Sequence, residues 1–142
     1  MKFQITPEDF LKGGLVTVGW HPSQIVKWDD TSKVAGDTAK HPGSQLINVE
    51  FKIIDGPDKG KTLYHNFSET ALAFMVPLLE AFGAKFDKKT IVEIEPTKAS
   101  MEGKYVDCHV MRGSYKGKPN STIDLWRPFS GKVAAVQQEA GV

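Results

Sequence analysis

Two alternating segments joined by a turn make up residues 46–67, LINVEFKIIDGPDKGKTLYHNF, and this stretch decides the fold. In residues 47–53 apolar side chains occupy every second position, and a period of two is typical of a half-buried strand. Residues 55–60 are rich in Gly, Pro and Asp, which favour tight turns, so the chain is expected to reverse there. Alternation resumes in residues 62–67. The stretch therefore predicts a hairpin of two antiparallel strands.

Three more strands are expected, one before this hairpin and two after it. An extended segment over residues 15–28 precedes it. Alternation in residues 106–111 predicts a fourth strand, and alternation in residues 123–126 predicts a fifth. The polar stretch 29–44 has no hydrophobic periodicity and predicts a long flexible loop.

A single helix is predicted between the third and fourth strands. Its apolar stripe is formed by Ala71, Met75, Leu78, Leu79 and Phe82. Ser68 is expected to cap its start and Gly83 to end it. Pro77 is expected to kink the helix or to limit it to its first part.

The order of these elements predicts the fold class. Three strands, a helix and two strands are the pattern of a mainly β protein, a five-stranded OB-fold barrel with one helix between strands 3 and 4. An SH3-like barrel does not need that helix, and a ferredoxin-like fold needs a second long helix. We expect the barrel to span residues 1–128, with a flexible loop at 29–44 and a C-terminal tail at 129–142.

Composition limits the class of protein. The chain has 142 residues with 18 basic and 17 acidic side chains, a net charge of +1, so it is not basic overall as many nucleic-acid binders are. It has neither the ~18–20 apolar residues in a row that a membrane span requires nor a secretory signal, which predicts a cytoplasmic protein without membrane contact. The single Cys108 leaves no internal disulfide and is expected to be buried.

Positive charge is concentrated near the predicted C-terminal hairpin. Residues 104–128 include five basic and two acidic side chains, a local net charge of +3. Arg112, Lys116 and Lys118 surround Tyr115 in the hairpin loop, with glycines between them. Because cations neutralise phosphates while rings stack on bases, the loop predicts a nucleic-acid contact. The alternative is a solvated, lysine-rich turn.

Aromatic residues are expected on the outer face of the barrel. In the fifth strand Ile123 and Leu125 are expected to face the core, which turns Trp126 outward. Tyr64 points outward for the same reason, and Trp28 is added to the set although the sequence does not fix its direction. Bases stack on such rings at ~1–3 kcal/mol each. The alternative is that the helix, the tail or a partner chain covers them.

No catalytic or metal-binding pattern stands out. The four histidines share no ligand spacing, and no Ser-His-Asp or paired-carboxylate arrangement is visible. Residues 56–62 resemble a phosphate-binding loop, but they join two strands, and the first glycine is one residue too close to Gly-Lys-Thr. We therefore expect no enzymatic activity, no cofactor and no metal site.

Three short segments carry a resemblance to a known family: IIDGPDKGKT at 53–62, EGK at 102–104 and GSYKGKPN at 113–120. With them the chain resembles phage-encoded proteins of the single-stranded-DNA-binding and recombination-associated type. The resemblance implies an OB barrel acting in the cytoplasm of the host cell in phage DNA replication, recombination or repair. By position it implies DNA contacts at Tyr64, Tyr115, Lys116, Lys118 and Trp126. The near-neutral tail departs from the acidic tail with which many such proteins recruit partners.

These observations predict a largely sequence-independent single-stranded DNA-binding protein, with phage replication or recombination proteins as further partners. An alternative is an OB-fold protein interaction module, since fold alone does not choose between the two uses. An enzyme with a distributed site is a third class. DNA or RNA preference and oligomeric state stay open. The predicted nucleic-acid site comprises Tyr64, Tyr115, Trp126, Arg112, Lys116, Lys118, Lys52, Lys59, Lys61 and Trp28.

Overall fold

The computed structural model describes a curled sheet, its connecting helices and parts of the loops. Its elements are β1 (Gly19–Val34), β2 (Gln45–Ile53), β3 (Thr62–Ser68), the 3-10 helix η1 (Leu72–Met75), α2 (Val76–Ala81), α3 (Lys98–Met101), β4 (Tyr105–Tyr115) and β5 (Lys118–Pro128). The described residues are 2, 4, 15–37, 42–87, 89, 94–115 and 117–131. Within these ranges no helix is long and apolar enough to cross a membrane.

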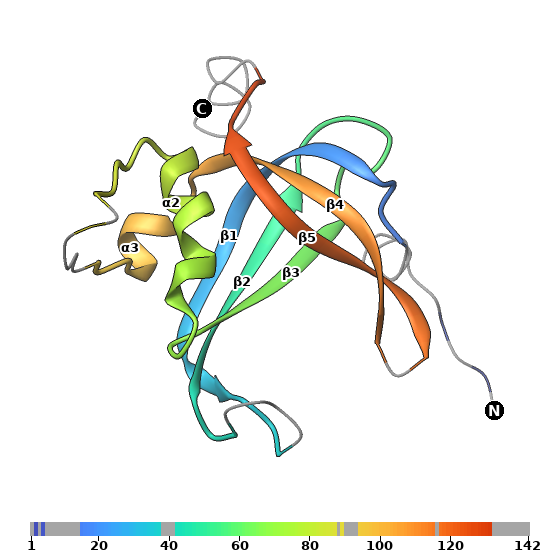
Figure 1. Cartoon of the computed structure of the whole chain (residues 1–142). Coiled ribbons are helices and arrows are strands. Elements are labelled where there is room, and N and C mark those ends of the chain that lie inside the picture. The colour runs from blue at the N-terminus through green and yellow to red at the C-terminus, as the bar shows by residue number, and fades with distance from the viewer. Residues whose placement is uncertain are drawn as a thin grey trace.

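All five strands form one antiparallel sheet in the order β3-β2-β1-β4-β5 (Figure 1). β1 is 16 residues long and belongs to both halves of the sheet, because residues 19–24 pair with β4 and residues 23–34 pair with β2. The sheet curls about this shared strand and brings the edge strands β3 and β5 into contact. The expectation of a mainly β, five-stranded protein with a helix after the third strand is confirmed.

The sheet does not close into a hydrogen-bonded barrel. No backbone hydrogen bond joins β3 to β5 in the described part of the chain. At one end of this gap the buried side chains of Met75 and Leu78, from η1 and α2, pack between the two strands. At the other end Val16 is buried, and its N–H donates to Ser121 Oγ on β5 at 2.8 Å. The gap between β3 and β5 is therefore covered at both ends by side chains.

A β-bulge in β1 turns Trp28 into the core. The pairing of β1 with β2 skips Val26 between Ile25 and Lys27, so Val26 is an extra residue. One extra residue shifts the inward and outward alternation by one position. Ile25 and Trp28 therefore both face inward, and Trp28 is 2% exposed while Val26 is 42% exposed. The prediction that Trp28 belongs to the binding surface is therefore wrong, because the bulge turns its side chain into the core.

A second bulge, in β5, turns Trp126 into the core. The pairing of β5 with β4 skips Asp124, because His109 pairs with Leu125 and Val110 with Ile123. Ile123 and Trp126 therefore face inward, and Leu125 faces solvent. The sequence-based expectation had Leu125 inside and Trp126 outside, and the bulge reverses both.

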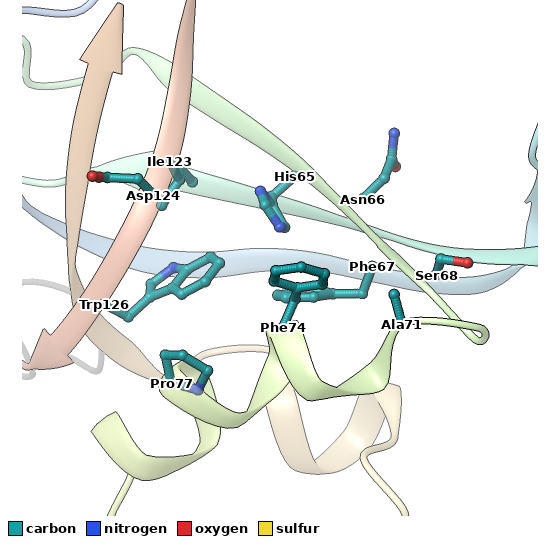
Figure 2. Close-up of a pocket in the computed structure, with 10 residues that line it drawn as sticks. All are labelled: His65, Asn66, Phe67, Ser68, Ala71, Phe74, Pro77, Ile123, Asp124 and Trp126. Atoms are coloured by element: carbon teal, nitrogen blue, oxygen red, sulfur yellow. The ribbon is translucent and has the colours of Figure 1, made fainter. Parts of the chain in front are cut away.

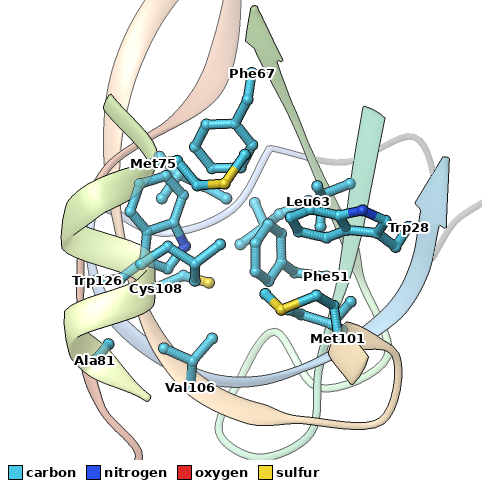
Figure 3. Close-up of a cluster of buried hydrophobic side chains, with 14 of the residues drawn as sticks. Trp28, Phe51, Leu63, Phe67, Met75, Ala81, Met101, Val106, Cys108 and Trp126 are labelled. Carbon is cyan, nitrogen blue, oxygen red and sulfur yellow. The ribbon is translucent and has the colours of Figure 1, made fainter. Parts of the chain in front are cut away.

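The two tryptophans meet in one aromatic core (Figure 3). The ring centroid of Phe67 lies 6.4 Å from that of Trp28 and 5.5 Å from that of Trp126. Cys108 is fully buried beside them, as expected, and burial raises the pKa of its thiol to about 12. Large rings from three strands thus fill the space that the curled sheet encloses.

The boundaries of several predicted elements are corrected. β1 continues to Val34, so the predicted loop over residues 29–44 begins later than expected. β4 ends at Tyr115 and β5 begins at Lys118, and these two residues pair, so the strands continue into the segment that was predicted to be a hairpin loop.

The helical region also differs from its prediction. Ser68 ends β3 and does not cap the helix, since the helical residues begin at Leu72. Pro77 lies in the first turn of α2, where its missing N–H costs no hydrogen bond. Gly83 follows the helix with a φ of 98°. This agrees with the prediction that Gly83 ends the helix. α3, capped by Thr97, was not predicted.

Candidate functional site

The outer surface of β1, β2 and β3 carries one exposed aromatic ring among polar side chains. Lys27, Glu50 and Tyr64 stand opposite one another on the three strands, and Lys52 is diagonal to Tyr64. Side chains in such positions are close enough to act together. Tyr64 is 51% exposed, and both lysines are exposed. We call these four residues, with Asn66, the outer face.

Asn66 extends the outer face along β3. Its Oδ1 accepts a hydrogen bond of 2.8 Å from Nδ2 of the buried Asn48, which stands opposite it on β2. The side chain of Asn66 is exposed beside Tyr64 on the same face of the strand. The surface next to the ring is therefore polar and fixed in place.

Two of the predicted cations hold the chain segment 15–17 in place. Lys61 Nζ donates to the backbone oxygen of Leu15 at 2.9 Å and to Asp58 Oδ1 at 2.8 Å. Arg112 donates to the backbone oxygen of Val16 at 3.0 Å and to Ser121 Oγ at 3.2 Å. Each of these side chains joins the segment to a neighbouring strand or turn and so has a structural role.

Asp58 completes the attachment of this segment. Burial by itself raises the pKa of Asp58, but the hydrogen bonds from Lys61 and from the Thr17 N–H outweigh it and lower the pKa to about 2. The carboxylate is thus charged at neutral pH. It binds both the segment and the turn between β2 and β3.

The other predicted cations are exposed but not gathered around one ring. Lys52 lies on the outer face, and Lys59 lies in the turn between β2 and β3. Lys118 lies at the β4–β5 turn, which Figure 1 shows well apart from the β2–β3 turn. The side chain of Tyr115 and all of Lys116 lie outside the described residues. Of the predicted site, the structure thus brings together Tyr64 and Lys52.

A cleft opens between β3 and β5 where the sheet is not closed (Figure 2). It has a volume of about 440 Å³. His65, Phe67 and Trp126 form its floor, with the His65 ring centroid 4.6 Å from that of Phe67 and 5.0 Å from that of Trp126. Phe74, from η1, stands over it with 72% of its surface exposed. The other lining residues are Asn66, Ser68, Ala71, Pro77, Ile123 and Asp124.

The cleft is apolar, with little charge. Burial lowers the pKa of His65 to about 4, so its imidazole is neutral at pH 7. Asp124 is the single carboxylate of the lining, and its Oδ1 lies 2.6 Å from Nδ1 of His109. No lysine or arginine lines the cleft among the described residues. The cleft suits an apolar group with a neutral or cationic neighbour.

Phe74, His65 and Lys27 are among the residues of these two surfaces that are absent from the site predicted from sequence. Phe74 lies off the apolar stripe of the predicted helix, and a position off this stripe indicates an exposed side chain. His65 was considered only as a metal ligand. Lys27 joins the outer face because the bulge at Val26 sets its direction, and nothing in the alternation of β1 indicates a bulge there.

A third cluster, on the outer surface of β1, β4 and β5, is held together by contacts within the protein. The Arg127 guanidinium lies 4.2 Å from the ring centroid of Trp20 and donates to the buried Asp107 at 2.9 Å. His109 packs edge-on against the same indole. One face of Trp20 is therefore covered by a cation, which makes it a poor stacking platform.

Two observations complete the account of the site. In the part of the chain that is described, no three His, Cys, Asp or Glu side chains gather closely enough to hold a metal ion. Neither a protein-family model nor a curated protein matches this chain.

Proposed function

We propose that this protein binds single-stranded DNA, largely independently of sequence, on the outer face of β1–β3. The observation that carries the proposal is the half-exposed ring of Tyr64 with Lys27 and Lys52 beside it. A base stacked on such a ring gains ~1–3 kcal/mol, and every base offers a flat surface for stacking. The two ammonium groups neutralise phosphates on either side.

The order of the elements supports an OB barrel as the scaffold. Three strands, a helix and two strands, with β1 shared between the two halves of the sheet, agree with that fold. OB barrels bind oligonucleotides on the face of strands 2 and 3. Tyr64 and Lys52 lie on that face. A role in phage DNA replication, recombination or repair rests on the sequence resemblance alone.

The proposed site differs from the one expected from sequence. Of the four predicted rings, Tyr64 is on this surface, Trp126 and Trp28 are in the core, and the side chain of Tyr115 lies outside the described residues. Glu50 stands beside Tyr64 and opposes the approach of phosphate, and the net charge of the chain is only +1. We therefore propose modest affinity with a strong dependence on salt.

Fluorescein-labelled oligo-dT tests the proposal by polarisation. The Tyr64→Ala protein should bind about 5- to 150-fold more weakly, because it loses one stacking contact of ~1–3 kcal/mol. The Phe74→Ala protein is the matched control, since Phe74 is an exposed ring on the other side of β3, and it should bind as the wild type does. Lys52→Ala should reduce the slope of log K against log salt by about one.

Two results would contradict this. If the wild type does not bind oligo-dT at low salt, the protein is not a DNA-binding protein of this kind. If Tyr64→Ala binds normally, the outer face is not the site.

A further inference from the structure

The cleft between β3 and β5 has one large aromatic ring, Phe74, exposed to solvent above it. Phe74 is 72% exposed, although a large ring gains ~1.5–3 kcal/mol when it is buried. The ring does not contribute to the core, to which the same helical region supplies Met75, Leu78 and Ala81. Phe74 therefore adds little to the stability of the free protein, and its position over the cleft indicates binding.

Two unpaired strand edges run along the cleft. Among the described strands β3 pairs only with β2 and β5 only with β4, so within the described part of the chain no strand pairs with the edges that face each other across the gap. Residues 65–68 of β3 and residues 123–126 of β5 contribute to the lining. An edge strand presents backbone N–H and C=O groups that an extended chain can satisfy. The cleft thus offers backbone pairing beside an apolar pocket.

The charge of the lining discriminates between classes of ligand. Among the described lining residues Asp124 is the single carboxylate, its Oδ1 lies 2.6 Å from Nδ1 of His109, and no lysine or arginine is present to balance a phosphate. A nucleotide would bring its phosphates towards this carboxylate. A peptide with a basic residue beside its apolar anchor would instead be attracted.

We infer that the cleft is a docking site for an extended segment of a partner protein, one that carries an aromatic or large aliphatic side chain next to a lysine or arginine. The apolar side chain enters between Phe74 and Trp126, and the cation lies near Asp124. Successive side chains of β3 point to opposite faces, and Asn66 is the one residue that the outer face shares with the lining of the cleft. The two exposed rings, Tyr64 for the DNA and Phe74 for the partner, therefore lie on different sides of β3.

A library of random dodecapeptides displayed on phage tests this inference. Panning on the wild type, with counter-selection on Phe74→Ala, should enrich peptides that pair an aromatic or large aliphatic residue with a basic one. A synthetic labelled peptide of the enriched sequence should bind Phe74→Ala at least 10-fold more weakly. Tyr64→Ala and Leu125→Ser should bind it as the wild type does, since Leu125 is exposed on the other face of β5.

The contribution of charge is tested separately. Asp124→Asn should weaken binding of the basic peptide several-fold. It should not change binding of a peptide whose basic residue is replaced by norleucine. Glu80→Gln is the matched control, because Glu80 is exposed on α2 but does not line the cleft. Peptide-induced changes in amide NMR spectra should map to residues 65–68, 71–77 and 122–126.

Three outcomes would overturn the inference: no peptide is enriched, enriched peptides bind Phe74→Ala as tightly as the wild type, or oligo-dT binding is lost in Phe74→Ala and kept in Tyr64→Ala. The last outcome would make the cleft a base-binding site. Since peptide and oligo-dT binding are measured separately, failure of one does not imply failure of the other.

Discussion

At the scale of single residues, His65 shows how the surroundings of a side chain decide its chemistry. It follows the exposed Tyr64 on β3, yet it faces the opposite way and packs edge-on against Phe67 and Trp126. Burial lowers its pKa from 6.5 to about 4, because a charged imidazole loses its hydration there. The folded protein therefore holds this ring neutral over a range in which the unfolded chain protonates it.

The stability of the protein should depend on His65 between pH 6.5 and 4. With a folded pKa below the unfolded one, the contribution is complete above pH 6.5 and is lost as the pH falls towards 4. The loss should reach roughly 2 kcal/mol, allowing for partial contact with solvent. Urea unfolding at pH 7, 5.5 and 4.5 measures it. A His65→Phe variant keeps an aromatic ring but cannot be protonated, so its stability should change less over this range. An identical pH profile in the two proteins would exclude His65 as the source.

At the scale of elements, two bulges decide which side chains form the core. In β1 and in β5 one extra residue lies between an inward isoleucine and an inward tryptophan, in the pattern Ile25-x-x-Trp28 and Ile123-x-x-Trp126. Strict alternation would place each tryptophan on the outer surface. The two bulges thus supply the rings that pack on Phe67 from either side.

Deleting Val26 should therefore unfold the protein or nearly so. Without the extra residue, the side chains of β1 on one side of position 26 move to the opposite face of the sheet. If Trp28 stays in the core, Ile25 must then point outward. Loss of such a buried side chain costs about 2–5 kcal/mol, a large part of the stability of a domain of this size. Thermal unfolding followed by circular dichroism measures the loss. The Val26→Ala substitution, which keeps the bulge and changes an exposed side chain, should stay within ~0.5 kcal/mol of wild type.

The bulges also explain which parts of the fold the sequence could predict. The hairpin of β2 and β3 was predicted correctly because its alternation is unbroken and its turn is dense in Gly, Pro and Asp. The succession of the five strands along the chain was also predicted from such local patterns. The directions of Trp28 and Trp126 depend on how one strand pairs with the next, and that information is not local. The predicted set of rings therefore lost two members, while Tyr64, on a regular strand, was placed correctly.

At the scale of the whole molecule, the gap between β3 and β5 is closed by parts of the chain far apart in sequence. Helices η1 and α2 cover one end, and residues 15–17 cover the other through Lys61, Asp58, Arg112 and Ser121. What remains open between them is the cleft. Its size and position are thus set by the whole fold, and no segment of the sequence predicts it alone.

Replacing Asp58 by Asn should loosen the end of the gap that residues 15–17 cover. The variant loses a buried ion pair and should be less stable at pH 7 by about 1–3 kcal/mol. Because the pKa of Asp58 is lowered from 3.8 to about 2, its contribution is present above pH 3.8 and is lost as the pH falls towards 2. The acid limb of a urea-unfolding profile should therefore be shallower in the variant. Asp55→Asn, an exposed change in the same turn, serves as the control and should keep the wild-type profile.

The inward turn of Trp28 and Trp126, together with the cation that covers Trp20, has a practical consequence for spectroscopy. All three indoles of the chain report on packing within the protein. Their emission follows the integrity of the interior, and a ligand held by Tyr64 would be almost invisible to it. Of the two surfaces, the cleft is the one lined by an indole, that of Trp126. A ligand bound there should change the wavelength or intensity of tryptophan emission, so the protein carries a native optical signal that distinguishes its two surfaces.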